Sequence, residues 1–269
     1  MGFGTRFASA IALFGIGGLA GYYDKVGLHT LWLVCQICLF YELSSVLSKK
    51  IKIHKFAFTL SFVSTHIFSL SYIFEFQHQN CLRVGSIMLA LACFMRIVFS
   101  AQNENLNEAA VEINYQLVII VLVSFLSQFV HLLIKTNPGL LILQFLLVIV
   151  NDSFAYFCGK AFGKHKLIKI SPNKTVEGFF GGAAFTIGLV EVLVKFISRK
   201  WEITLEKNIL YAFACYVAFL GPLGGFYASL MKRTFGVKDF SNLIPGHGGV
   251  MDRCDCQIIS SFVLWLMIQ

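Results

Sequence analysis

The chain has little charge and few acidic residues. Only 13% of its 269 residues are charged, whereas 57% are hydrophobic, and the mean hydropathy is +0.73. A soluble domain carries about 25% charged residues. Apolar runs near the length that a helix needs to cross a bilayer recur along the whole sequence. The composition therefore excludes an ordinary soluble domain and predicts an all-α, polytopic integral membrane protein.

The sequence also lacks the patterns of a disulfide framework or a zinc site. Most of the eight cysteines lie in or beside apolar runs, where cysteine acts as a small hydrophobic residue. Cys35 and Cys38 form a C-x-x-C pair, but no second pair accompanies them, so zinc or redox chemistry is disfavoured. The first apolar run has no small-residue cleavage site, which favours a retained span over a signal peptide. With no internal repeat and no separate soluble region, we expect a single membrane domain over 1–269.

Nine apolar segments are candidates for transmembrane helices, and an odd number places the two termini on opposite sides. With the N-terminus in the cytosol, 15 basic residues fall on the cytosolic side and 7 on the other, which accounts for all 22. This asymmetry agrees with the positive-inside rule and places loops 159–177 and 232–253 on one cytosolic face. We group 1–149 as N-terminal helices and 150–269 as catalytic helices and cytosolic loops. The nine segments are 6–23, 27–47, 56–74, 82–99, 113–134, 139–158, 178–197, 208–231 and 254–269.

The densest polar run extends from Ser229 to Gln257 and holds three of the chain's five aspartates. If a helix begins near Met251, Asp252 and Asp255 share one face, with Cβ atoms about 5–6 Å apart. Two carboxylates that close repel each other unless a proton or a cation lies between them. Mg²⁺ is the simplest occupant, and it usually arrives with substrate phosphates. The alternative is that the two acids only favour a helix N-terminus through the helix dipole.

The segment IPGHGG, residues 244–249, cannot form a regular helix and predicts a shaped loop. Near a membrane, such a backbone must lie against protein or water. His247 stands between glycines and could donate a hydrogen bond to a phosphate. The alternative is an ordinary surface histidine.

A second polar run extends from residue 150 to residue 182. Asn151 and Asp152 follow a long apolar segment, so Asp152 is expected within the bilayer depth, where a carboxylate needs a cation. The alternative is a pair that only hydrogen-bonds neighbouring helices. The loop that follows contains His165 and five lysines with no acid, and some of these lysines would serve only topology or contact anionic headgroups. The lysines are Lys160, Lys164, Lys166, Lys169 and Lys174.

The segment SPNKT, residues 171–175, predicts an anion site. Asn173 or Thr175 can cap a helix that begins near Val176. A helix N-terminus beside Ser171, Lys174 and Thr175 offers backbone N–H groups and positive charge to a phosphate. Three glycines in the helix would let another backbone approach closely, either for the site or for ordinary helix packing. They are Gly178, Gly181 and Gly182.

Together these residues resemble the signature of phosphatidate cytidylyltransferases, also called CDP-diacylglycerol synthases. The match in the second half of the chain comprises Ser229, Lys232, Arg233, Lys238, Asp239, Pro245, His247, Gly248, Gly249, Asp252, Arg253 and Asp255. The upstream match comprises Asn151, Asp152, Ala155, Tyr156, Gly159, Phe162, Gly163, Ser171, Pro172, Lys174, Thr175, Glu177 and Gly178. Over 1–149 the resemblance is mainly a shared pattern of spans.

Two details resemble the eukaryotic branch of that family. The signature ends in D-C-Q, and residues 221–225 read G-P-x-G-G. Bacterial members tend to carry an acid four residues before the signature serine, whereas this chain has Gly225 there. The resemblance implies that Asp152 or Asp239 compensates for that missing ligand.

The resemblance further implies a nucleotidyltransferase of phospholipid biosynthesis that converts CTP and phosphatidate into CDP-diacylglycerol and pyrophosphate. It implies a membrane enzyme, in the endoplasmic reticulum of a eukaryote, with its site facing the cytosol, a homodimeric state and no nucleic-acid partner. Mg²⁺ would be held by Asp239, Asp252 and Asp255. These three would act in catalysis with Lys232 and Arg233. Substrate would be bound by Ser171, Lys174, Thr175, Ser229, Lys238, His247, Arg253 and Asp152.

Two other functions remain open from the residues alone. A CTP-dependent lipid kinase, such as a polyprenol kinase, would transfer the γ-phosphoryl group and release CDP. An ion-coupled transporter would use Asp152 and the Asp252/Asp255 pair for a coupling ion. The transporter is disfavoured because the charges collect at one rim and no inverted repeat is present.

Overall fold

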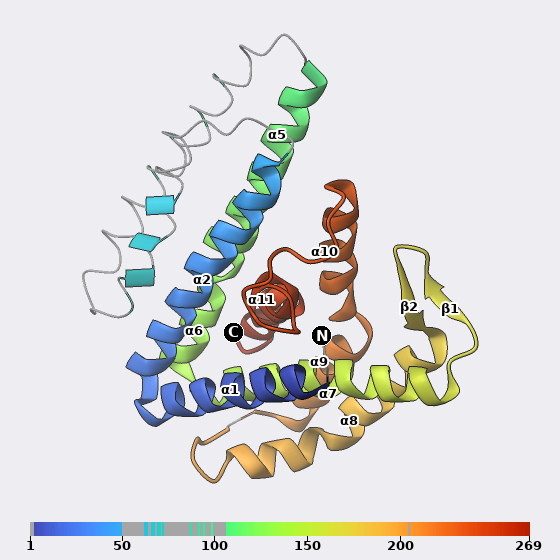
Figure 1. The fold of residues 1–269 in the computed structure, drawn as a ribbon. Coiled ribbons are helices and arrows are strands. Elements are labelled where there is room, and N and C mark those ends of the chain that lie inside the picture. Colours follow the sequence, from blue (N-terminus) through green and yellow to red (C-terminus); the bar gives the residue numbers. More distant parts are fainter. Residues whose placement is uncertain are drawn as a thin grey trace. The chain divides into compact units, whose positions relative to one another are not determined.

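The computed structural model describes residues 3–49, 106–203 and 205–269, with isolated helical positions between 62 and 98. The expected spans 56–74 and 82–99 therefore lie mostly outside the described residues. The described chain is mostly helical (Figure 1). Its helices, in chain order, are α1 (Phe3–Tyr22), α2 (Asp24–Ser48), α5 (Leu106–Ile119), the π-helix η1 (Ile120–Leu126), α6 (Gln128–Thr136), α7 (Pro138–Phe162), α8 (Val176–Ile197), α9 (Lys207–Phe219), α10 (Pro222–Thr234) and α11 (Met251–Met267).

Within the described part of the chain, five helical stretches are long and apolar enough to cross a membrane. This confirms the expectation of a polytopic membrane protein with several spans. One of the five, Lys207–Thr234, comprises both α9 and α10. Helix α11 is not one of the five candidate spans. The five are Asp24–Ser48, Leu117–Thr136, Pro138–Phe162, Val176–Ile197 and Lys207–Thr234.

An antiparallel hairpin between α7 and α8 departs from the predicted all-α fold. Strand β1 (Lys166–Ile168) pairs with β2 (Ser171–Thr175), with Lys166 opposite Thr175 and Ile168 opposite Ser171. The hairpin is visible in Figure 1 beside its two helices. Pro172 explains why this stretch is not helical, since proline is tolerated in an edge strand but not in a helix interior. The sequence indicated a loop here and gave no period-2 pattern from which a strand could be predicted.

The described structure divides into two compact units. Unit 1 comprises Met1–His131 and Asp239–Asp252, and unit 2 comprises Leu132–Lys238 and Arg253–Gln269. In unit 1, buried leucines on one side of α2 are joined by a buried polar network. Gln36 Nε2 donates to Ser127 Oγ at 2.5 Å, and His131 Nε2 lies 3.0 Å from Gln36 Oε1. Polar contacts of this kind hold helices together where lipid supplies no hydrophobic driving force.

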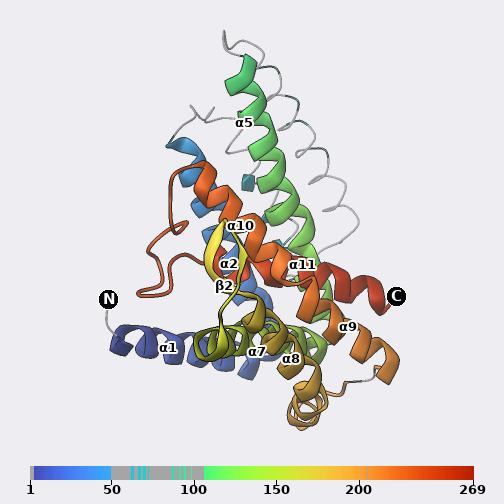
Figure 2. The same ribbon diagram turned by 90° about the vertical axis from the view of Figure 1, so that its right-hand side faces the viewer.

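In unit 2, α7 and α8 lie side by side, as both ribbon views show (Figure 1, Figure 2). Small residues permit this approach. A Cβ on Gly178 would lie 2.5 Å from the backbone oxygen of Ala155, and one on Gly182 would lie 2.7 Å from the backbone oxygen of Asn151. A Cβ on Gly181 would lie equally close to Cys158. The predicted close approach of another backbone is therefore confirmed at Gly178 and Gly182, where it serves helix packing, whereas Gly181 meets a side chain.

Asn151 and Asp152, adjacent in sequence, have different partners. Asn151 is buried, donates weakly to Val217 O on α9 at 3.4 Å and accepts from Thr186 Oγ1 on α8 at 3.3 Å. It therefore matches the alternative in which a polar side chain ties helices together. Asp152, the next residue, is exposed and belongs to the charged group described below.

Candidate functional site

The N-terminus of α11 lies at Met251, as the sequence predicted. Asp252, in its first turn, anchors the preceding loop. Its Oδ2 accepts a hydrogen bond from Gly249 N at 2.9 Å and another from Phe240 N at 3.0 Å. Asp252 therefore lies in the first turn of a helix, as the alternative based on the helix dipole required. Its hydrogen bond to Phe240 N, 12 residues earlier in the chain, also closes the loop.

The IPGHGG segment forms the shaped loop that was predicted. Ile244 N donates to Gly248 O at 2.8 Å, which closes an isolated bridge. Gly246 and Gly248 have φ values of 77° and 83°, a region that favours glycine. A Cβ on Gly248 would also lie 2.8 Å from Asp252 Oδ2 and 3.4 Å from Asp239 Oδ1. Two of the predicted acids, Asp239 and Asp252, therefore converge on this glycine.

His247 is held by α1 of the same unit. Its Nδ1 lies 2.8 Å from Ser9 Oγ, and the Ser9 hydroxyl also donates to Pro245 O at 2.9 Å. Because one hydroxyl has one proton, donation to Pro245 requires the His247 Nδ1–H to donate to Ser9. In the neutral ring Nε2 is then an acceptor, and in the protonated ring it is a donor that can meet an anion.

Sequence reasoning missed Glu42, a buried acid on α2. Its carboxylate accepts from Ser241 Oγ at 2.6 Å and from the backbone N–H groups of Val250 and Met251, each at 2.8 Å. One signal in the sequence could have identified it, because an ionisable residue within an apolar span is a functional candidate by default. The predicted 27–47 span contains this acid.

Unit 2 contains a charged group around Gly225 on α10. A Cβ on Gly225 would lie 3.5 Å from both Lys174 Nζ and Asp255 Oδ2. The Lys174 ammonium also lies 4.4 Å from the centroid of the Phe226 ring, which is a cation–π contact. A strand residue and a helix residue far apart in sequence therefore meet at one glycine.

Three more charged residues, Asp152, Lys232 and Arg253, interact electrostatically within the same group. Asp152 lies in the electrostatic field of Lys174 and Arg253. Asp255 is repelled by Asp152 and attracted by Lys174 and Lys232. We call these five residues the Gly225 group. The group contains two carboxylates and three cations, which is a suitable balance for binding phosphates with a divalent ion.

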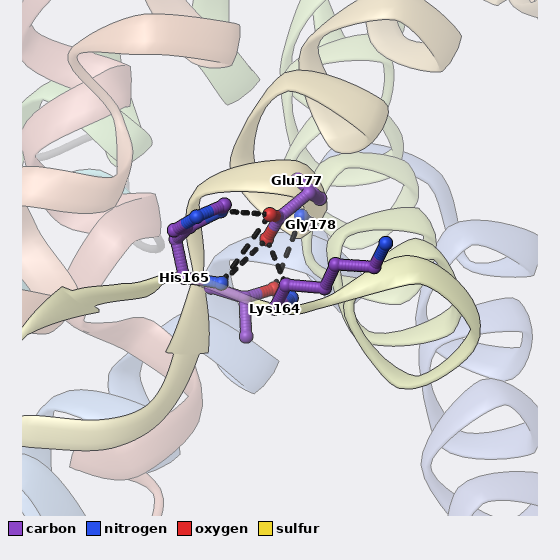
Figure 3. Close-up of polar contacts among 5 residues, drawn as sticks. Lys164, His165, Glu177 and Gly178 are labelled. Carbon is purple, nitrogen blue, oxygen red and sulfur yellow. Dashed lines mark hydrogen bonds and ion pairs between the residues drawn. The ribbon is translucent and has the colours of Figure 1, made fainter.

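Four contacts tie the hairpin, which carries Lys174, to the start of α8. Thr175 is the N-cap, and its Oγ1 accepts from Gly178 N at 3.1 Å, which confirms one of the two predicted caps. Glu177 accepts from the backbone N–H groups of Lys164 and His165 at 3.0 and 3.2 Å. The His165 ring adds an Nδ1 contact to Glu177 at 2.6 Å (Figure 3). The last residue of β2 and the two residues just before β1 are thereby anchored to one helix terminus.

The remaining predicted residues have structural or exposed positions. Ser229 Oγ donates to Gly225 O at 2.7 Å, so this serine supports the glycine around which the group lies. Arg233 Nη1 donates to Val237 O at 3.3 Å. Lys238 is exposed, and Ser171 opens β2.

The carboxylate oxygens in both regions suit a hard cation as ligands. Within the described ranges no cluster of three or more His, Cys, Asp or Glu side chains is placed to hold a metal ion. Mg²⁺ does not need such a cluster, because it is usually bound by one or two carboxylates together with waters and substrate phosphates. The carboxylates that converge on Gly248 and those of the Gly225 group fit this requirement.

These features define a class of protein: a polytopic membrane protein with carboxylates and basic side chains gathered at helix ends and loops. The chain belongs to the Cytidylyltransferase family, which it matches over residues 4–269.

Curated relatives from distant organisms share this similarity. The chain is 38% identical over 158 residues to the phosphatidate cytidylyltransferase of Saccharomyces cerevisiae, a match that covers 42% of this chain and 35% of the relative. It is 36% identical over 162 residues to human phosphatidate cytidylyltransferase 1, covering 43% and 35%. The Aquifex aeolicus enzyme is 42% identical over 122 residues, covering 44% and 43%. Each match spans less than half of the relative's length.

Proposed function

We propose that this protein is a CTP:phosphatidate cytidylyltransferase that makes CDP-diacylglycerol and pyrophosphate for phospholipid synthesis. The observation that carries the proposal is the meeting of Lys174 and Asp255 at Gly225, with Asp152, Lys232 and Arg253 in the same group. Membership of the family and the names of the relatives support the same activity.

The reaction suits residues of this kind. A phosphate monoester oxygen of phosphatidate attacks the α-phosphorus of CTP, a new P–O bond forms, and the bond to the bridging α–β oxygen breaks as pyrophosphate leaves. The attacking phosphate is largely dianionic at neutral pH because its second pKa is about 6, so no strong general base is required. The difficulty is to bring two polyanions together, and fixed cationic side chains overcome that repulsion.

We assign the basic residues to this charge compensation. Lys174, at the hairpin and the N-terminus of α8, would bind the triphosphate of CTP. Lys232, Arg233 and Arg253 would neutralise the reacting and leaving phosphates. Ser171, Thr175, Ser229, Lys238 and His247 remain assigned to substrate binding.

Mg²⁺ would be held by Asp239, Asp252 and Asp255. When bound, the ion would stabilise negative charge on phosphate oxygens. This chain has Gly225 where bacterial members tend to carry an acidic ligand. The electrostatic interaction of Asp152 with Asp255 supports Asp152 as the carboxylate that replaces that ligand. The acids of unit 1 and of unit 2 each offer oxygen ligands of the type Mg²⁺ prefers.

The lipid substrate accounts for the membrane scaffold. The acyl chains of phosphatidate would stay in the bilayer while its headgroup meets CTP at the cytosolic rim. This proposal includes the nine spans, the cytosolic N-terminus and an endoplasmic reticulum membrane if the source is eukaryotic. A homodimer rests on the family resemblance.

Labelled CTP tests the reaction. Purified protein in phosphatidate-containing vesicles is incubated with Mg²⁺ and CTP that carries ³²P at either the α- or the γ-phosphate. Label from the α-position is expected in the lipid fraction. Label from the γ-position in lipid would identify a lipid kinase instead, and no label from either position would favour the transporter.

A further inference from the structure

Glu42 is an acidic residue in a buried position. It is only 1% exposed and lies on the apolar helix α2. A buried carboxylate is unfavourable unless its oxygens are well satisfied, and an apolar residue of similar size is often as stabilising. Glu42 therefore needs an explanation beyond packing.

All of its donors among the described contacts belong to one short segment. Oε1 accepts from Ser241 Oγ at 2.6 Å and from Val250 N at 2.8 Å, and Oε2 accepts from Met251 N at 2.8 Å. Val250 and Met251 are at the start of α11, where backbone N–H groups have no partner within the helix. Glu42 satisfies two of these groups from a position about 200 residues away in sequence.

Gly249 shows how closely the loop passes over this carboxylate. A Cβ there would lie 2.6 Å from Glu42 Oε2 and 2.7 Å from Oε1, so only glycine fits while Glu42 is in place. The same turn is also held by Asp252, whose Oδ2 accepts from Gly249 N. Two carboxylates, one from α2 and one from α11, thus hold the loop between residues 240 and 251.

We propose that Glu42 is a positioning residue for the reaction, which acts through this loop. The loop carries His247 and leads into Asp252, and both belong to the proposed site. With Glu42 in place, the loop has one conformation before substrate arrives, so that binding does not have to order it. This inference rests on the proposed function.

The first test compares Glu42→Gln with Gln36→Ala, a matched control on the same helix. Gln36 is fully buried and hydrogen-bonded to Ser127, and its described contacts do not include the loop. Both variants should lower the midpoint of thermal unfolding. Only Glu42→Gln should lower kcat/KM for CTP, by at least about 10-fold, because its amide presents an N–H to backbone donors. Equal losses of activity at equal losses of stability would overturn the positioning role.

A double-mutant cycle keeps the proposal testable if Glu42→Gln folds poorly. Gly249→Ala should be strongly damaging alone, because its methyl group would overlap the Glu42 carboxylate. In a Glu42→Ala background the same substitution should cause little further loss in thermal stability or in CTP turnover. Additive effects would show that the carboxylate does not meet the loop, and the proposal would fail.

The outcome also separates this inference from the proposed function. A wild-type protein that transfers no label from α-labelled CTP would overturn both. A wild-type protein that is active, with Glu42→Gln no worse than Gln36→Ala, would overturn only the role of Glu42.

Discussion

Asp252 and Asp255 are three residues apart on one helix, yet they have different surroundings. In unit 1, the Oδ2 of Asp252 is engaged by two backbone N–H groups of the loop before α11. In unit 2, Asp255 directs its Oδ2 toward Gly225 and interacts electrostatically with Lys174, Lys232 and Asp152. The same residue type at helical spacing thus shapes a loop in one region and faces cations in the other. Spacing alone predicted two equivalent metal ligands.

The largest expected effect is on Asp255. Asp255→Asn should lower kcat by about 100-fold, as for the loss of an electrostatic contact worth about 3 kcal/mol in the transition state. Thermal stability should be unchanged or slightly higher, because the change removes one of two carboxylates that repel each other. Steady-state rates and thermal unfolding of the purified variant check both parts. Near-normal activity would remove Asp255 from the chemistry.

Lys174→Ala should have the next largest effect. We expect the KM for CTP to rise, or kcat to fall, by about 10-fold, as for a lost charge-assisted contact. The KM for phosphatidate should hardly change, because the lysine is assigned to the triphosphate. Lys169→Ala, an exposed lysine in the turn of the same hairpin, is the control and should behave as wild type. A loss confined to phosphatidate would reassign the hairpin to the lipid headgroup.

Asp252→Ala and Asp255→Ala should differ in their effect on the free energy of unfolding. Asp252→Ala removes the acceptor for two backbone N–H groups, so we expect a loss of about 1–2 kcal/mol, in the range of a lost helix cap. Asp255→Ala should not destabilise the protein in this way. Thermal unfolding of the two variants under one condition makes the comparison. If both variants unfold at the same temperature, the loop contacts of Asp252 contribute nothing to stability.

Much of the local structure could be predicted because its signals are local. Val176 and Met251 begin helices as expected, Thr175 caps α8, and the IPGHGG glycines form a shaped loop. Glu42 and Ser9 could not be assigned to the loop, since their partners lie about 200 residues away or more. The hairpin was missed because β1 is only three residues long and β2 contains a proline. The unequal roles of Asp252 and Asp255 depend on what packs against each residue.

The last prediction concerns membrane topology, that is, on which side of the bilayer the hairpin and the loop before α11 lie. Lys169→Cys and Asn242→Cys, each the only cysteine in its variant, should both react with a membrane-impermeant thiol reagent from the cytosolic side. Lys200→Cys, which the predicted nine-span topology places on the opposite face, is the control and should react only from the other side. Reaction of the first two from opposite faces would separate the hairpin from the loop and end the proposal of a shared site.

The stoichiometry of CTP use tests the central claim most directly. Pyrophosphate release and transfer of α-labelled nucleotide to lipid are measured together, with and without phosphatidate, for wild type and for Asp255→Asn. The account predicts one pyrophosphate for each nucleotide transferred, no transfer without phosphatidate, and about 100-fold slower transfer in the variant. Release of CDP with γ-label in lipid, or equal rates in the two proteins, would contradict it.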